Sequence, residues 1–110
     1  MRMAGAQKFT KTVAGHVVVA SATPIKFFTT VCYNGTGGNI WLQVFDAAAE
    51  PAGGTVPTFP PLVIASGDTR FYDFYDYGRP MATGVVVATS STAGIYTATA
   101  DSNFIDVGVG

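Results

Sequence analysis

Two aspartates, three residues apart, interrupt the aromatic segment RFYDFYDYGRP (residues 70–80) and could in principle form an acid/base pair. Catalysis by paired carboxylates requires both side chains in one site. On an extended strand, Asp73 and Asp76 project from opposite faces because successive side chains alternate. Local geometry therefore argues against a paired site, and Asp76 is expected to cap the turn that contains Gly78.

The sequence offers little for nucleophilic or metal-dependent chemistry. It contains one histidine, His16, and one cysteine, Cys32, which are too few for a zinc site. Any catalytic triad would depend on His16, and Cys32 lies in the apolar run FFTTVCY, where a buried, unreactive thiol is expected. The turn aspartates Asp46, Asp68 and Asp101 leave calcium binding open, although no loop concentrates oxygen ligands. We therefore expect no catalytic, metal or cofactor-binding residues and no enzymatic activity.

Charged side chains are scarce in this chain. They make up 12% of 110 residues, whereas hydrophobic residues make up 48%, and ordinary soluble domains are about 25% charged. A monomer normally keeps a charged surface for solubility, so this scarcity predicts burial against other subunits. A net charge of −1 without a basic cluster argues against a nucleic-acid partner. Membrane insertion is not expected either, because no run of about 18 apolar residues occurs.

Short β-branched and aromatic segments, separated by Gly, Pro, Asn and Ser, predict an all-β fold with no substantial helix. Without helices for crossovers a parallel sheet is excluded, so we predict an antiparallel β-sandwich or jelly roll of seven to eight short strands. We expect one domain, with an N-terminal arm and first strand in residues 1–24 and the β-sandwich in residues 25–110. The expected strands are 15–22, 24–34, 40–46, 61–65, 69–75, 83–90, 94–100 and 103–109.

Some strands carry more large apolar side chains than a sandwich core needs. In residues 40–46, one face carries Ile40, Leu42 and Val44, and the other carries Trp41, Gln43 and Phe45. A strand of a sandwich in water needs only one apolar face. The second face therefore predicts contact with another subunit.

The aromatic segment 70–80 divides in the same way. One side carries Phe71, Asp73, Tyr75 and Tyr77, the other Tyr72, Phe74 and Asp76, and either Phe71 or Phe74 is expected in the core. Tyrosine combines an apolar ring with a hydroxyl group, which is typical of interfaces. The candidate subunit-interface residues are Trp41, Tyr72, Tyr75, Tyr77 and Arg79.

A series of short motifs follows along residues 25–109. It comprises Tyr33-Asn34 and Phe45-Asp46 at strand ends, GTVP at 54–57, a segment from Gly78 to Gly84, VVATSST at 86–92 and YTATAD at 96–101. This pattern resembles small structural proteins of tailed-bacteriophage virions. The resemblance implies a β-sandwich component of the virion that is made in the host cytoplasm, and it supplies no catalytic residues.

Together these observations predict a capsid decoration (cement) protein that stabilises contacts between capsid subunits. We expect a homo-oligomer, with a trimer favoured, that binds the major capsid protein or other virion proteins. Two alternatives stay open: a tail, collar or baseplate component with the same fold, and a glycan-binding host-adhesion module with Trp41 and the tyrosines as its platform.

Overall fold

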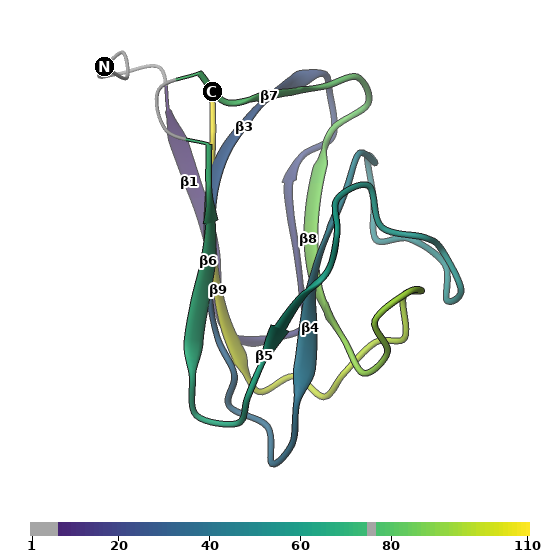
Figure 1. Cartoon of the computed structure of the whole chain (residues 1–110). Coiled ribbons are helices and arrows are strands. Elements are labelled where there is room, and N and C mark those ends of the chain that lie inside the picture. Colours follow the sequence, from purple (N-terminus) through teal and green to yellow (C-terminus); the bar gives the residue numbers. More distant parts are fainter. Residues whose placement is uncertain (1–6, 75–76) are drawn as a thin grey trace.

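The computed structural model describes residues 7–74 and 77–110, which form nine β-strands and no helix. The strands form two antiparallel sheets that pack face to face (Figure 1), which confirms the predicted β-sandwich. In the described part of the chain, no helix is available that could cross a membrane. The strands are β1 (Lys8–Gly15), β2 (Val17–Ser21), β3 (Ile25–Tyr33), β4 (Ile40–Phe45), β5 (Leu62–Ile64), β6 (Thr69–Asp73), β7 (Arg79–Met81), β8 (Val85–Ser90) and β9 (Asn103–Val109).

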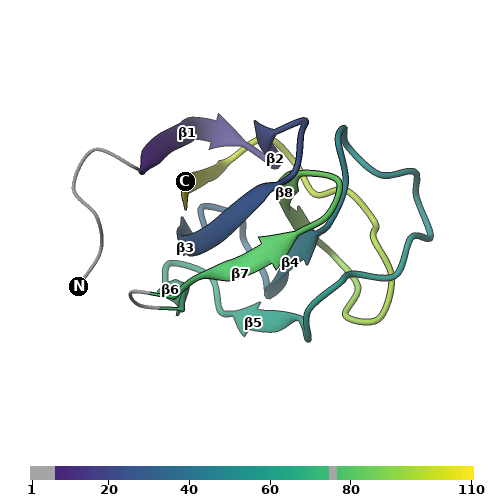
Figure 2. The ribbon, with the colours of Figure 1, turned by 90° about the horizontal axis from the view of Figure 1, so that it is seen from above.

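The strand order is that of a jelly roll. Sheet A has the order β1-β9-β3-β6, with β7 also paired to β3, and sheet B has the order β2-β8-β4-β5. Within the sheets β1 pairs with β9, β2 with β8, β3 with β6 and β4 with β5, all antiparallel. This is the pattern of one long hairpin rolled into two layers, with β7 as a fifth strand of sheet A, and Figure 2 shows the layers from above.

Three segments differ from the predicted strands. Residues 94–100 form a loop in which only Ala98 makes a bridge, to Ser90. The side-chain amide of Gln43 donates to the carbonyl oxygens of Thr92, Ala93 and Ile95 at 2.9, 2.9 and 3.1 Å. These carbonyl groups therefore bond to a side chain and not to the backbone of a neighbouring strand. Strands β1 and β7 were not predicted, because β1 is rich in polar residues and β7 contains a proline, which is tolerated at a sheet edge.

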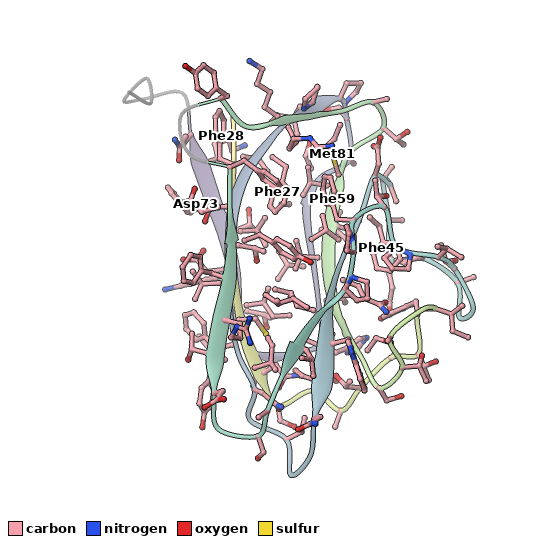
Figure 3. The ribbon with its side chains drawn as sticks, in the orientation of Figure 1. Phe27, Phe28, Phe45, Phe59, Asp73 and Met81 are labelled. Carbon is pink, nitrogen blue, oxygen red and sulfur yellow. The ribbon has the colours of Figure 1, made fainter. Side chains whose placement is uncertain are left out.

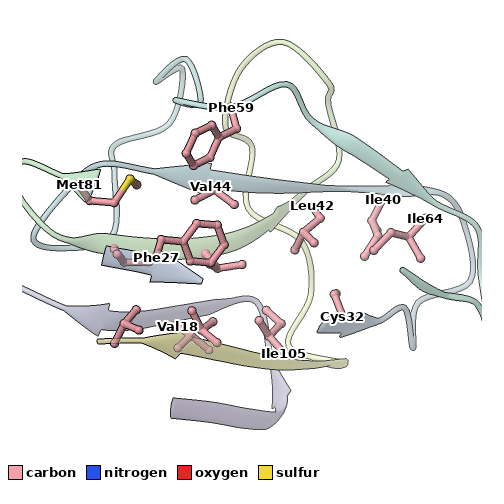
Figure 4. Close-up of a cluster of buried hydrophobic side chains, with 14 residues drawn as sticks. Val18, Phe27, Cys32, Ile40, Leu42, Val44, Phe59, Ile64, Met81 and Ile105 are labelled. Atoms are coloured by element: carbon pink, nitrogen blue, oxygen red, sulfur yellow. The ribbon is translucent and has the colours of Figure 1, made fainter. Parts of the chain in front are cut away.

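The hydrophobic core fills the space between the inner faces of the two sheets (Figure 4). Sheet B contributes Ile40, Leu42, Val44, Ile64, Val85 and Val87, and sheet A contributes Phe27, Cys32, Ile105, Val107 and Val109. Phe27 lies against Phe59 and Phe74, with ring centroids 6.1 and 5.5 Å away. The predicted burial of Cys32 is confirmed, and burial raises the pKa of its thiol to about 12.

A bulge in β3 changes which of its side chains face the core. The register between β3 and β9 shifts between Phe27 and Thr29, so the regular alternation of side chains in an extended strand breaks at Phe28. Phe28 is buried against Gly78, in the loop before β7. A Cβ at this position would lie 2.9 Å from the Phe28 ring, and Gly78 has a φ of 67°, so both the space and the backbone favour glycine. After the bulge, Val31 and Tyr33 are exposed.

Asp46, at the end of β4, ties sheet B to the loop that precedes β8. Its carboxylate accepts backbone N–H groups from Ala82, Thr83 and Gly84 at 2.9, 2.8 and 3.2 Å. Burial alone would raise the pKa of Asp46, but the three backbone donors together lower it. The carboxylate of Asp46, which was considered as a calcium ligand, is therefore engaged in hydrogen bonds to the backbone.

Replacing Leu42 with alanine should destabilise the fold strongly. Leu42 is 0% exposed in the centre of the core, and such truncations cost about 2–5 kcal/mol because they leave a cavity. Urea unfolding followed by tryptophan fluorescence would measure the loss. The control is Val56→Ala at a side chain that is 70% exposed, where a loss above about 0.5 kcal/mol would contradict the surface assignment.

Replacing Asp46 with asparagine should remove a pH-dependent part of the stability. A lowered pKa in the folded state gives stability that is present above the ordinary value of 3.8 and is lost as the pH falls through the folded-state pKa. We expect Asp46→Asn to lose about 1 kcal/mol at pH 7 and to approach the parent protein only as the pH falls below the folded-state pKa of Asp46. Urea unfolding across this range tests the expectation, and a difference independent of pH would refute it.

Candidate functional site

The outer face of sheet B is covered by the chain's own loops. Tyr96, in the loop between β8 and β9, packs on Phe45 with ring centroids 5.6 Å apart. Both side chains are buried, together with Val86 and Ala88 beneath them. The predicted intersubunit contact of Gln43 and Phe45 is therefore wrong: the face on which they lie is covered from within the same chain.

Within residues 7–74 and 77–110, no segment covers the outer face of sheet A, which we call the open face. Residues paired across neighbouring antiparallel strands point to the same side of a sheet, so the register defines rows of outward side chains. One row is Lys11, Asp106, Val31 and Phe71, the second is Phe9, Gly108, Thr29 and Asp73, and the third contains Phe104, Tyr33 and Thr69. Figure 3 shows Asp73 on the side of β6 that faces away from the core residue Phe27.

Large apolar side chains are exposed on this outer face. Phe9 is 61% exposed and Phe71 is 63% exposed, and Val31 and Tyr33 between them are also accessible. The ring of Phe9 lies over Gly108, where a Cβ would approach it to 2.8 Å. An apolar surface shared by several strands is typical of a protein-interaction site.

The charges in the middle of this face are few and of opposite sign. Lys11 on β1 lies opposite Asp106 on β9 in the register of the two strands. The Oδ1 atom of Asp106 is buried and has no hydrogen-bond partner among the residues that the structure describes. A buried acceptor without a donor is costly, so this oxygen is a local cost to the stability of the fold.

The structure distributes the predicted interface residues over different surfaces. Trp41 is half-buried on the outer side of sheet B, in register with Ser90 and Val63. Tyr77 is 84% exposed next to β7. Tyr75 lies outside the described residues, so its predicted role is not addressed.

Tyr72 and Arg79 both lie against Phe74. The ring of Tyr72 stacks on that of Phe74 with centroids 6.4 Å apart, and the Arg79 guanidinium lies 5.4 Å from the Phe74 centroid and 4.9 Å from that of Phe59. The Tyr72 hydroxyl donates to the carbonyl of Pro60, and burial raises the pKa of this tyrosine. The described members of the predicted set therefore do not share one face, and their role at a subunit boundary stays a prediction.

Sequence reasoning missed Phe9, Val31 and Phe71 as surface residues. The alternation in segment 70–80 correctly separates Phe71 from Phe74, and the structure directs Phe74 toward the core and Phe71 outward. One signal in the sequence could have identified this surface. Strands β3 and β6 each carry apolar or aromatic side chains on both faces, and only one face of each strand can point into the core. No group of three His, Cys, Asp or Glu side chains that could hold a metal ion occurs within residues 7–74 and 77–110.

No family model and no curated protein matches this chain. Among solved structures, the chain is similar to the coat protein of tobacco streak virus. The match has 10% sequence identity and a TM-score of 0.46, and it covers 99% of this chain and 89% of the coat protein. These values are too low to transfer a function, so we take the function from the residues of the chain itself.

In the free protein, where no other partner occupies it, the open face of sheet A should cause weak self-association at micromolar concentration. Introducing a charge with Phe71→Lys should weaken it, because a desolvated lysine without a partner is unfavourable in an apolar contact. Sedimentation velocity at several concentrations measures the effect, with Val56→Lys as a control at a similarly exposed loop residue. A parent protein that stays monomeric throughout would contradict the expectation.

Proposed function

We propose that the protein is a structural component of a bacteriophage particle, a capsid decoration protein that stabilises contacts between capsid subunits. The observation that carries the proposal is the open, apolar outer face of sheet A, opposite a sheet whose outer face the chain covers itself. The scarcity of charge and the resemblance of residues 25–109 to small phage virion proteins support the same reading. Jelly rolls also recur in viral capsid proteins, although a fold alone does not assign a function.

The proposed mechanism is passive burial of surface. Exposed aromatic and aliphatic side chains on a rigid sheet lose little conformational freedom when a partner covers them, so much of the hydrophobic gain is kept. A particle under internal pressure is stabilised by any contact that must break when its subunits separate. In this proposal Phe9, Val31 and Phe71 supply that contact, and Lys11 and Asp106 set its orientation.

The size of the face indicates how such a contact would work. Four strands about 4.8 Å apart and three rows about 6.8 Å apart give a flat area of roughly 400 Å². A standard interface buries about 800 Å² per partner, so this face alone supports a weak contact. Attachment would then depend on several copies acting together, which is why we propose a homo-oligomer, with a trimer favoured, that binds the major capsid protein.

Binding of the protein to particles that lack it tests the proposal. Phe71→Asp should reduce binding at least tenfold, whereas Val56→Asp, an equally drastic change at an exposed loop residue, should bind like the parent. Quantitative mass spectrometry of purified particles supplies the copy number. Hundreds of copies support capsid decoration, a few to tens support a tail, collar or baseplate position, and absence from the particle refutes a virion role.

A further inference from the structure

His16 lies between two carboxylates that come from distant parts of the chain. It connects β1 to β2, and its Nδ1 contacts Oδ1 of Asp101 while its Nε2 lies 3.0 Å from Oε2 of Glu50. Glu50 belongs to the loop after β4, and Asp101 to the loop before β9. The histidine thus touches both loops near the covered face of sheet B.

The protonation state follows from these contacts. A neutral imidazole has one N–H donor and one acceptor nitrogen, whereas an imidazolium has two donors. Both nitrogens of His16 face carboxylate oxygens, which only accept hydrogen bonds when ionised. The arrangement is fully satisfied only when His16 is protonated, and deprotonation leaves one carboxylate facing a nitrogen lone pair.

We propose that His16 is a pH-operated latch that fastens the two loops covering sheet B to the turn between β1 and β2. The latch is closed when the imidazole is protonated and loosens when the proton is lost. This inference concerns the covered sheet and does not depend on the proposed function of sheet A.

The two loops are already joined to each other, so the latch would act on them as one unit. Oε2 of Glu50 also accepts the hydroxyl of Tyr96 at 2.6 Å. The N–H of Gly54 donates to the carbonyl of Tyr96, and the N–H of Tyr96 donates to the carbonyl of Thr55, both at 2.8 Å. On the other side, the carbonyl of His16 accepts the N–H of Thr89 at 2.9 Å, which anchors the histidine to β8.

The charged groups that face His16 define the direction of the switch. The hydrogen bond that His16 donates to Asp101 is the largest cause that raises the pKa of His16; burial, the next largest, lowers it, and the hydrogen bond to Glu50 raises it again. Stabilisation from a raised pKa is complete below the ordinary value of 6.5 and is lost as the pH rises through the folded-state pKa. The hydrogen bond from Tyr96, followed by that from His16, lowers the pKa of Glu50, so this carboxylate is ionised throughout the same range.

The first experiment uses the fact that His16 is the single histidine of the chain. Its ring protons give isolated NMR signals in untagged protein, and their titration reports its pKa directly. We expect a midpoint above 6.5 that falls in Asp101→Asn, while Asp68→Asn, which changes an aspartate between β5 and β6, leaves it unchanged. A midpoint at or below the ordinary value, or one that Asp101→Asn does not lower, overturns the proposal.

The second experiment asks whether the loops respond. Hydrogen exchange of residues 91–102, corrected for the intrinsic effect of pH, should show about two- to fivefold less protection above the His16 midpoint than below it. His16→Gln keeps hydrogen-bonding capacity but cannot titrate, so its protection should not change across that midpoint. If this variant does not fold, Asp101→Asn supplies the test instead: its change in protection should move to its own, lower His16 midpoint. Equal protection of the parent protein on both sides of the midpoint refutes the latch.

Discussion

Packing of the two sheets against each other is the interaction on which the rest of the structure depends. Two sheets have four faces, and the inner pair is closed by Phe27, Leu42, Val87 and their neighbours. The loops after β4 and β8 are long enough to cover a third face, where they bury Phe45 beneath Tyr96. The fourth face, on sheet A, remains open and retains its apolar side chains. The candidate interaction surface is therefore a consequence of how a short chain distributes its loops.

Much of the fold follows from local patterns in the sequence. Alternation in residues 40–46 identifies Ile40, Leu42 and Val44 as one face, and these residues do lie in the core. The absence of helix signals and the spacing of turn residues correctly indicated a sandwich. The bulge at Phe28 could not be read in advance, because it depends on the pairing of β3 with β9, a strand about 75 positions later in the sequence.

The candidate site was harder to predict, for a physical reason. Alternation tells which side chains share a face, but it does not tell which face a loop will cover. Trp41 and Phe71 look equivalent in the sequence, yet Trp41 lies half-buried on the sheet that the chain covers and Phe71 lies on the open one. The lone histidine was considered only for catalysis and zinc binding, and its two carboxylate partners, Glu50 and Asp101, become its neighbours only in three dimensions.

The position of β9 has a consequence for how the chain reaches its final shape. This strand is the last in the sequence, yet it lies between β1 and β3 in the middle of sheet A. Because β9 is the strand to which β1 is paired, residues up to Val109 must be synthesised before β1 can join sheet A. Contacts between such distant segments slow folding, because a long loop must close before they form. The addition of β1 to sheet A is thus expected to wait until β9 has been made, whereas β3 can pair earlier with β6 and β7.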